Sequence, residues 1–550
     1  MTRLTGDIKT MRYRNTGPTY RRFRLAGFGA VLLLGIGACD PDKLTQVNTD
    51  PNNPTSAPPQ AVFTYATRRA MERWFGGAPG EMSLRATELT VQHLAQVQYP
   101  DEDAYARLDG VDTDDSFIFT YASELKNFQS VIEAGEAANQ PLLWGPALVM
   151  QSLLYGYVTD TWGDVPYTEA LQGNAESPVI LPAYDTQKDI YDGLFANLTQ
   201  AVTAIAGAPA GAVTLSGADP IYGGSRVSWQ RFANSIRARH AIRLANVDQT
   251  TARAQLTAAI NAPGGLIQSN ADNAQISWPG DGIYDNPWSL NNQTRDDHRM
   301  SDRLVNEMVP VNDPRIAVYA QPTLCFEDPT ISPDCPAVPP KYAGMPNALS
   351  ATDAATYSLI SSRPGEVFYG TDLFCDGCTT LQGAHFPSFI LTFAEVSFIL
   401  AEAAERGWIA GSAAAYYEQG IRASMEQWGV TDAAAIATYL ARPEIIYVPG
   451  VEGQRRIALQ KWIALYTDGV TAWSEWRRTC VPATIKPGPD AIIGTVPRRY
   501  QYSIREHTTN SANVDAAIAR QGAYDFTSRM YWDTAPQAAP TWPGASCGVR

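Results

Sequence analysis

The stretch FAEVSFILAEAAERGWIAGSAAAYYEQGIRASMEQWG, residues 393–429, carries the clearest periodic pattern in the chain. Apolar side chains recur in its first part at three- and four-residue spacing, which predicts an amphipathic helix that ends at Gly407. A second helix is predicted from about Ser412 to Trp428, with Gly429 at its end. Two such helices joined by a short glycine-containing turn form an αα-hairpin. Because neither helix can bury its apolar face alone, the pattern predicts that hairpins of this kind stack on one another.

Helical patterns also dominate most of the remaining chain. Further helices are predicted at residues 121–137, 142–159, 185–205, 228–246 and 251–260, with Ser228 as the N-cap of the fourth. Residues 262–386 differ, because they are rich in Pro, Gly, Asn and Asp and contain only short helical patches such as 300–308. The predicted fold class is therefore mostly α, with a tetratricopeptide-like scaffold of helix hairpins and a loop-rich region of minor β content. No clean repeat of about 34 residues is present.

The first 38 residues have the features of a secretory signal peptide. A basic, arginine-rich region precedes an apolar segment from about Leu25 to Ala38, which is too short to span roughly 30 Å of hydrocarbon as a helix. The sequence IGAC at residues 36–39 resembles a bacterial lipobox, in which the cysteine is acylated and becomes the new N-terminus. Cys39 is therefore the predicted lipid-attachment residue. Met11 is an alternative translation start.

This start predicts the domain organisation. Residues 39–60 form a lipidated, extended leader, and residues 61–550 form a single body with the irregular insertion at about 262–386. Beyond Cys39 no window offers the ~20 apolar residues of a membrane span, so the protein is expected to be attached to a membrane by acyl chains such as palmitate. Asp40 and Asp42 resemble the acidic signal that sends lipoproteins to the outer face of an outer membrane.

Charge and cysteine content narrow the classes of partner. The formal net charge of −14 argues against nucleic acid and against unaided binding to acidic lipid, because the long-range field repels polyanions.

Seven cysteines minus the lipidated Cys39 leave six, an even number in a compartment that permits disulfides. We pair neighbours, although six cysteines allow fifteen connectivities. The expected disulfides are Cys325–Cys335, Cys375–Cys378 and Cys480–Cys547. The CDGC motif could instead be half of a zinc site or a redox motif, but no second CxxC is present.

Several motifs in a fixed order resemble one protein family. They are LTQVNTDPNNPT (44–55), YGYVTDTWGDVPYTEAL (155–171), RDDHRMSDRLVNEM followed by NDPRI (295–316), PSFILTFAEVSFILAEAAERGW (387–408), YYEQGIRASMEQWGV (416–430), ALQKWIALYTDGVTAWSEWRRT (458–479) and PRRYQYSIRE (497–506). Together they resemble a SusD/RagB-type lipoprotein, also described as SusD-like or starch-binding outer-membrane associated. The resemblance extends from Cys39 to Asp533, nearly the whole chain after the predicted signal peptide.

The resemblance implies a fold, a ligand face and a partner. It implies a helical body built on tetratricopeptide-like helix pairs, with the irregular region forming the ligand face. It also implies a SusC-like TonB-dependent outer-membrane barrel, on which the lipoprotein sits as a hinged lid. In that arrangement the lid captures an oligosaccharide or a peptide outside the cell, and import through the barrel follows.

Motifs for catalysis or for a metal or cofactor site are missing from the sequence. The five histidines are scattered, and no HExxH, GxSxG, P-loop or GxGxxG motif is present. Asp164 is the strongest single candidate for an acid catalyst, but a buried turn carboxylate that accepts backbone N–H bonds is favoured. The acidic run at residues 109–115 suggests calcium, yet it lacks the EF-hand glycine, so a solvated loop is favoured. We therefore expect no catalytic residue, no metal and no cofactor.

Binding is better supported, because 13 Trp and 26 Tyr supply rings that stack on sugar faces or on peptide side chains. Those in helical patterns, Trp144, Trp408, Trp428 and Trp462, are interpreted as scaffold. Those assigned to irregular segments are the ligand-face candidates, together with polar neighbours that suit hydroxyls or amides. The candidates are Trp74, Tyr99, Tyr105, Tyr284, Trp288, Asn291, Asn292 and Arg295. An ordinary capped loop before the helix at Met300 is the alternative.

Three functions compete on this basis. A surface capture lipoprotein that serves a transporter is favoured over a surface glycan hydrolase or peptidase, and over a helical-repeat adaptor that binds no small ligand. The cargo class, glycan or peptide, is left open by the sequence.

Overall fold

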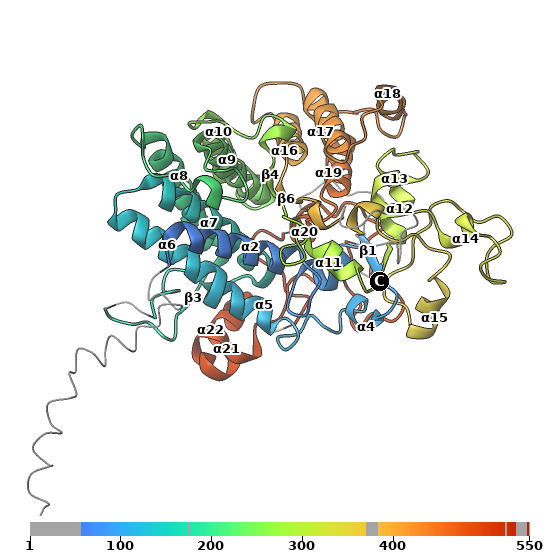
Figure 1. Ribbon diagram of the computed structural model, residues 1–550, viewed down its shortest axis with the longest axis horizontal. Helices are drawn as coiled ribbons and strands as arrows, with labels where there is room; N and C mark the ends of the chain where they lie inside the picture. The colour runs from blue at the N-terminus through green and yellow to red at the C-terminus, as the bar shows by residue number, and fades with distance from the viewer. Residues whose placement is uncertain (1–56, 174–175, 370–382, 523–524, 535–546, 549–550) are drawn as a thin grey trace, which may run out of the picture. The chain divides into compact units, whose positions relative to one another are not determined.

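The computed structural model describes residues 57–173, 176–369, 383–522, 525–534 and 547–548 (Figure 1). The chain divides into two units, Met1–Ala57 and Pro58–Arg550, and nearly all described residues belong to the second. The expected signal peptide, Cys39, most of the leader and the expected Cys375–Cys378 pair lie outside the described residues.

The fold is mostly α-helical, as predicted. The longer helices are α2 (Pro59–Phe75), α6 (Lys126–Ala137), α7 (Pro141–Trp162), α8 (Gln187–Gly207), α9 (Arg226–Arg243), α10 (Gln249–Asn261), α16 (Phe393–Glu405), α17 (Ala413–Gln427), α18 (Ala433–Leu440), α19 (Val451–Ala464), α20 (Gly469–Thr479) and α22 (Ser511–Gln521). The shorter helices are α3 (Glu88–Thr90), α4 (Pro100–Asp103), α5 (Asp114–Phe119), α11 (Pro287–Asn292), α12 (Asp302–Met308), α13 (Ile316–Tyr319), α14 (Leu324–Glu327), α15 (Ala351–Thr356) and α21 (Ile504–Thr509).

Irregular helices and short strands complete the fold. Two π-helical turns, η1 (Ser83–Thr87) and η2 (Thr120–Leu125), are followed in the chain by the 3₁₀ turns η3 (Ser216–Ala218), η4 (Leu244–Asn246), η5 (Asn270–Asp272), η6 (Glu366–Phe368) and η7 (Gly383–His385). The described strands pair as antiparallel two-stranded ladders: β1 (Leu94–Gln96) with β5 (His298–Met300), β2 (Val165–Pro166) with β3 (Tyr184–Asp185), and β4 (Ala274–Ile276) with β6 (Ser388–Leu391). The β content is therefore minor.

The hairpin at residues 393–429 is present as predicted. The Thr392 side chain accepts a hydrogen bond from the Glu395 N–H and caps α16, and Ser412 caps α17 in the same way. Gly407 and Gly429, with φ of 68° and 77°, follow the two helices in the left-handed conformation, in which a Cβ would be strained. Local capping thus defines both helices, and packing of α16 on α17 buries their apolar faces.

Helices that are consecutive in the chain also pack in order. In Figure 1, α6, α7, α8, α9 and α10 form a stack in which each helix contacts the next, and α16 packs against α9. The hairpin α16–α17 in turn contacts α19, which leads into α20. This side-by-side arrangement is the tetratricopeptide-like scaffold that the periodic sequence predicts.

The predicted start of one helix is wrong by three residues. The N-cap of α9 is Ser225, whose hydroxyl accepts a hydrogen bond from the Ser228 N–H. Ser228 is thus inside the first turn instead of capping it. The structure prefers the earlier serine because Gly223 and Gly224, with φ of 58° and 81°, turn the chain just before it.

Buried ion pairs connect the helices in the interior. Arg239 of α9, Glu395 and Glu402 of α16, and Glu475 and Arg478 of α20 are all less than one tenth exposed. Arg478 makes 2.7 Å contacts with both Glu402 and Glu475, so a single guanidinium links α16 to α20. Such pairs fix the relative positions of helices, because an unpaired charge in the interior is strongly unfavourable.

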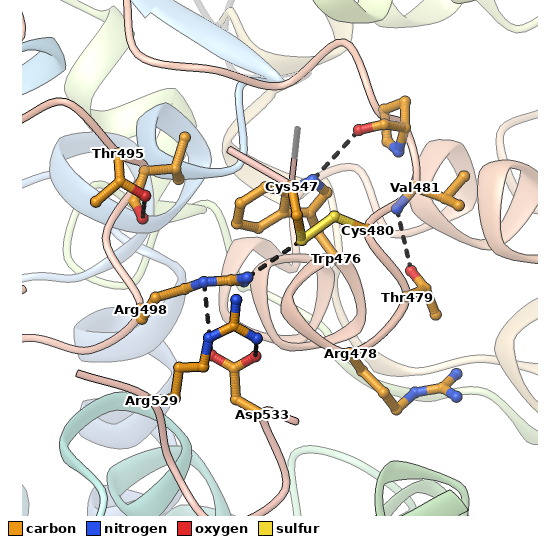
Figure 2. Close-up of a disulfide and its surroundings, with 12 residues drawn as sticks. Trp476, Arg478, Thr479, Cys480, Val481, Thr495, Arg498, Arg529, Asp533 and Cys547 are labelled. Carbon is orange, nitrogen blue, oxygen red and sulfur yellow. Dashed lines mark hydrogen bonds and ion pairs between the residues drawn. A yellow bond between two sulfur atoms is a disulfide. The ribbon is translucent and has the colours of Figure 1, made fainter. Parts of the chain in front are cut away.

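Two of the expected disulfides lie within the described residues, and both are bonded there. Cys325 is joined to Cys335, ten residues away, in the irregular region. Cys480, just after α20, is joined to Cys547 near the end of the chain. Figure 2 shows that Trp476 and Arg498 surround this second disulfide, and an Arg498 guanidinium N–H lies 3.1 Å from the Cys547 sulfur. The cross-link places Cys547 beside the C-terminal end of α20.

In the described part of the chain, no helix combines the length and the apolar character that a transmembrane span requires.

Candidate ligand-binding groove

Two adjoining cavities form a groove beside the N-terminal part of the body. They have volumes of about 390 Å³ and 230 Å³ and share the lining residues Pro79, Glu81 and Arg85. The larger cavity is also lined by Asn291 and Arg295. The combined space is in the range of about 300–1,000 Å³ that small-ligand sites usually have. We call these two cavities together the groove.

The wall of the groove is a loop that joins α2 to η1, residues 76–82. Gly80 is the turning point of this loop, with a φ of 79°. Its carbonyl accepts hydrogen bonds from the Arg73 guanidinium at 2.8 Å and from the Ser116 hydroxyl at 2.9 Å. The π-helical turn η1 follows and directs Arg85 into both cavities. π-Helical turns are frequent at functional sites, because the extra residue changes the direction of a side chain.

The opposite wall comes from the irregular region of the sequence. Asp281 accepts backbone hydrogen bonds from Ile283 and Tyr284, which closes a tight turn. Asn286 then caps the short helix α11 by accepting from the N–H groups of Trp288 and Ser289. This helix carries Asn291 at its C-terminal end, where the side chain lines the larger cavity.

Two exposed tyrosine rings flank the groove, and an arginine lies over each of them. The Arg295 guanidinium carbon is 5.4 Å from the ring centre of Tyr99, and that of Arg68 is 4.1 Å from the ring centre of Tyr284. Tyr99 is 39% exposed and Tyr284 is 38% exposed. Cation–π contacts of this kind hold an aromatic ring in place while leaving part of its surface to solvent. Fixed, partly exposed rings are suited to stacking on a ligand.

Charged side chains of both signs line the groove. The cations are Arg69, Arg85, Arg107 and Arg295, and the acids are Glu72, Glu81, Glu102, Asp112 and Asp285. Arg85 forms an ion pair with Glu102. The Arg295 guanidinium is oriented by its ion pair with Asp297, at 2.8 Å. The near balance of charge favours an uncharged ligand with many hydrogen-bonding groups, because guanidinium groups supply donors and carboxylates supply acceptors.

Burial affects two acids of the groove, Glu81 and Glu102. Burial raises the pKa of Glu81, opposed by the hydrogen bond from the Ala78 N–H. Burial also raises the pKa of Glu102, and the Arg85 guanidinium opposes that shift. Both carboxyls therefore bind protons more readily than exposed glutamates do.

The candidates from the sequence divide into two groups. Arg295 and Asn291 line the groove, and Tyr99 and Tyr284 flank it. Asn292 faces inward, and its side-chain N–H lies 3.4 Å from the Phe368 carbonyl. The structure thus brings Tyr99 together with Tyr284, Asn291 and Arg295, which lie far from it in the sequence.

Three aromatic candidates are corrected by the structure. Trp74 lies on α2 and is 1% exposed, packed against Tyr157 and Trp162, so its assignment to an irregular segment is wrong. Tyr105 and Trp288 are 1% and 2% exposed. Their rings fill the hydrophobic interior, which is the common position of large aromatic side chains. In their described positions none of the three offers a ring face to a ligand.

Sequence reasoning missed three arginines that line the groove, Arg69, Arg85 and Arg107, and also Arg68, which lies over Tyr284. Arg68, Arg69, Arg85 and Arg107 belong to helical or acidic stretches that carry no binding motif. The available sequence signal is the pair of glycines before Ala78, followed by Ala-Pro-Gly at residues 78–80, which indicates a bend in the loop between α2 and η1.

The carboxylates that sequence reasoning considered have structural roles. Asp164 is 6% exposed, accepts the Gln187 backbone N–H at 2.9 Å and pairs with Arg520 at 3.1 Å. It is thus a buried turn acid, as interpreted from the sequence. Asp109 accepts the N–H groups of Val111 and Asp112, both at 3.0 Å, and closes the acidic loop. Among the described residues, no group of His, Cys, Asp or Glu is arranged to hold a metal ion.

Fold and groove together define a mostly helical protein with a candidate ligand face, to which its irregular region contributes one wall. A family model described as SusD-like, starch-binding and associating with the outer membrane matches residues 51–503. The chain belongs to this SusD-like family. A comparison with curated proteins finds no match.

Solved structures share the fold over their whole length. A chitin-binding protein is 26% identical, with a TM-score of 0.70, and the alignment covers 87% of this chain and 100% of the other. A SusD homologue from Bacteroides fragilis is 24% identical with a TM-score of 0.71, covering 87% and 99%. A chitin-binding SusD homologue from Flavobacterium johnsoniae is 22% identical with a TM-score of 0.68, covering 86% and 98%.

Proposed function

We propose that this protein is a surface nutrient-binding lipoprotein that captures oligosaccharides in the groove and delivers them to a SusC-like TonB-dependent outer-membrane transporter, for which it acts as the lid. The observation that carries the proposal is the pair of partly exposed tyrosines, Tyr99 and Tyr284, each held by an arginine beside a groove of balanced charge. Aromatic rings bind the apolar faces of sugar rings, and the neighbouring polar groups bind the hydroxyls.

The family supports a carbohydrate as the ligand. Its description names starch, and two proteins of the same fold are described as chitin-binding. Both polymers are uncharged, which agrees with the mixed charges of the groove. A peptide is the alternative cargo, and binding experiments distinguish the two.

The remaining parts of the proposal rest on the sequence and on the family. Cys39 is the proposed lipid anchor, which places the body on the outer membrane, facing the exterior. Binding without turnover is proposed because the carboxylate that sequence reasoning favoured, Asp164, is occupied by a backbone N–H and by Arg520. No cofactor takes part in the proposed role.

Calorimetry on the purified protein tests the capture role. The titrants are maltohexaose and N-acetylchitohexaose as neutral sugars, hexagalacturonate as an acidic sugar, and a mixture of short peptides. After each titration the mixture is examined by chromatography for shortened products. We expect saturable binding of a neutral sugar that is recovered intact. Recovery of shortened sugar or peptide would establish a hydrolase instead, and binding of peptides alone would reassign the cargo.

Co-purification tests the transporter partnership. The lipoprotein, extracted from outer membranes in mild detergent, is expected to carry a large β-barrel protein with it in near-equal amount. An extract in which the lipoprotein is monomeric, while the groove still binds sugar, would separate capture from delivery.

A further inference from the structure

A cavity of about 620 Å³ lies at the turn of the α16–α17 hairpin, on different elements from the groove. Its wall consists of the C-terminal part of α10, the backbone that follows it, the hairpin turn, and one face each of α16 and α17. Its lining includes Asn261, Gln268, Phe393, Trp408, Tyr416 and Gln419. We call this space the hairpin cavity. It shares no lining residue with the groove.

Three aromatic rings form the apolar part of the hairpin cavity. Phe393, Trp408 and Tyr416 are all half-buried, so each contributes ring surface to the wall. Trp408 is interpreted from the sequence as scaffold, and in the structure it packs against the hydrophobic core while part of its ring also lines the cavity. Gly407 ends α16 with a φ of 68°, and the Trp408 N–H donates to the Ala403 carbonyl at 2.9 Å, which fixes the backbone of Trp408 at the start of the hairpin turn.

Neighbouring groups hold two of these rings in place. The Arg406 guanidinium lies 5.4 Å from the Trp408 ring centre and also donates to Glu402 and Asn246. Tyr416 packs over Gly411, where a Cβ would lie 2.8 Å from the ring. A ring that is already ordered loses little conformational entropy when a ligand binds to it.

Three side-chain amides contribute to the polar part of the hairpin cavity. Asn261 donates its N–H to the Thr257 carbonyl at 2.9 Å, Gln268 accepts from Arg231 at 3.2 Å, and the Gln419 oxygen is 3.4 Å from the Ser397 hydroxyl. Each amide is therefore oriented by one end. The second polar atom of each amide is the Asn261 oxygen, the Gln268 nitrogen or the Gln419 nitrogen. Among the described residues, none of these three atoms has a hydrogen-bond partner.

The chemistry of the lining limits the ligand. None of the lining residues carries a formal charge, whereas nine charged residues line the groove. A charged ligand would lose hydration there without gaining an ion pair from the lining residues. Fixed aromatic rings with amide donors and acceptors at their edge instead match an uncharged sugar, which presents apolar ring faces and hydroxyl groups.

We propose that the hairpin cavity is a second binding site, specific for uncharged saccharide units. It acts independently of the groove. A protein with two such sites binds a long neutral glycan at more than one position along the polymer.

Fluorine NMR on the 5-fluorotryptophan-labelled protein tests the proposal at the site itself. The Trp408→Phe variant assigns the Trp408 resonance, and Trp462→Phe assigns that of the fully buried Trp462 as an internal control. The labelled protein is titrated with maltohexaose, N-acetylchitohexaose, cellohexaose and hexagalacturonate. We expect a saturable shift of the Trp408 resonance with a neutral hexasaccharide, none with hexagalacturonate, and a stationary Trp462 resonance.

Variants test the role of the amides and the independence of the site. Gln268→Ala/Gln419→Ala is expected to weaken the midpoint of the Trp408 shift at least about tenfold. Glu418→Ala, an exposed neighbour on α17 that does not line the cavity, should leave the midpoint unchanged. The groove variant Tyr99→Ala/Tyr284→Ala should also leave it unchanged.

Three outcomes would overturn the proposal. They are a Trp408 resonance that none of the neutral hexasaccharides shifts, a shift that hexagalacturonate reproduces, and a shift that disappears in the groove variant. The last outcome would mean that Trp408 reports binding in the groove.

Discussion

Arg239 of α9 donates two hydrogen bonds to Glu395 of α16, at 2.8 Å and 2.5 Å, and both side chains are 1% exposed. Arg239 also donates to the Ile390 carbonyl at 2.7 Å. One guanidinium thus connects the α6–α10 stack to the hairpin segment, which lies about 150 residues further along the chain. Burial of this pair fixes how the two parts of the scaffold meet.

The first prediction concerns this pair. Glu395→Gln keeps the shape of the side chain but leaves Arg239 charged in the interior with a weaker partner, and we expect a loss of about 3–5 kcal/mol in the free energy of unfolding. Urea unfolding measures the loss. Glu418→Gln is the matched control, because it breaks the exposed Arg422 pair on α17 and should cost at most about 0.5 kcal/mol. Equal losses in both variants would contradict a special role for the buried pair.

The second prediction concerns pH. Burial raises the pKa of Asp468 to about 7, partly opposed by the Arg239 guanidinium. Between pH 5 and 7 the folded protein therefore holds a proton that the unfolded chain has released, so this group lowers stability as the pH rises. Asp468→Asn retains an N-cap for α20 and removes this contribution.

The expected result is a difference in slope. The free energy of unfolding is measured at several pH values for the Asp468→Asn variant and for the wild type. The variant value minus the wild-type value should rise by as much as about 1.4 kcal/mol per pH unit between pH 5 and 7. The difference cancels the titration of other groups, including the histidines. A flat difference would show that Asp468 is ionised throughout this range.

The third prediction compares the two disulfides. The Cys480–Cys547 bond closes a loop of 67 residues and the Cys325–Cys335 bond closes one of 10. Loop-closure entropy in the unfolded chain predicts stabilisation of about 4 and about 3 kcal/mol. Replacing each pair by alanine should lower the unfolding free energy in that order. The opposite order would assign the larger effect to native contacts around Cys325.

The fourth prediction concerns the flanking rings of the groove. Tyr284→Ala removes a ring that Arg68 holds at the surface, and sugar affinity measured by calorimetry should fall about two- to tenfold, since stacking contacts of this kind contribute roughly 0.5–1.5 kcal/mol. Tyr65→Ala removes a more exposed ring, 52% accessible, from α2 and should have no effect. Equal affinity of the two variants would exclude Tyr284 from the binding site.

The fifth prediction concerns the lipid anchor. Cys39→Ala removes the proposed acylation site, so the protein should move from the outer-membrane fraction to the soluble fraction. Cell fractionation followed by immunodetection measures the distribution. Cys325→Ala is a suitable control, since it removes a cysteine that is disulfide-bonded within the body. A Cys39→Ala protein that still sediments with outer membranes would show that something other than lipid holds it there.

Local features of the sequence determined the helical scaffold. The α16–α17 hairpin follows from apolar spacing, from the caps Thr392 and Ser412, and from Gly407 and Gly429, which all act over a few residues. The position of Asp164 in a buried turn likewise agreed with expectation. The start of α9 did not, because two serines three residues apart can both act as caps and the preceding turn selects between them.

The binding surfaces depended on tertiary structure. Trp74 and Trp408 are the same kind of residue, yet packing buries the first against Tyr157 and leaves the second half-exposed in a hairpin turn. Arg295 lies over Tyr99, and Arg68 over Tyr284, across about 200 residues of sequence in each case. Periodicity and capping act between neighbours in the chain, so the sequence by itself determined the helices. Which rings remain at the surface, and which arginines hold them, depends on contacts between distant segments, which only the folded chain brings together.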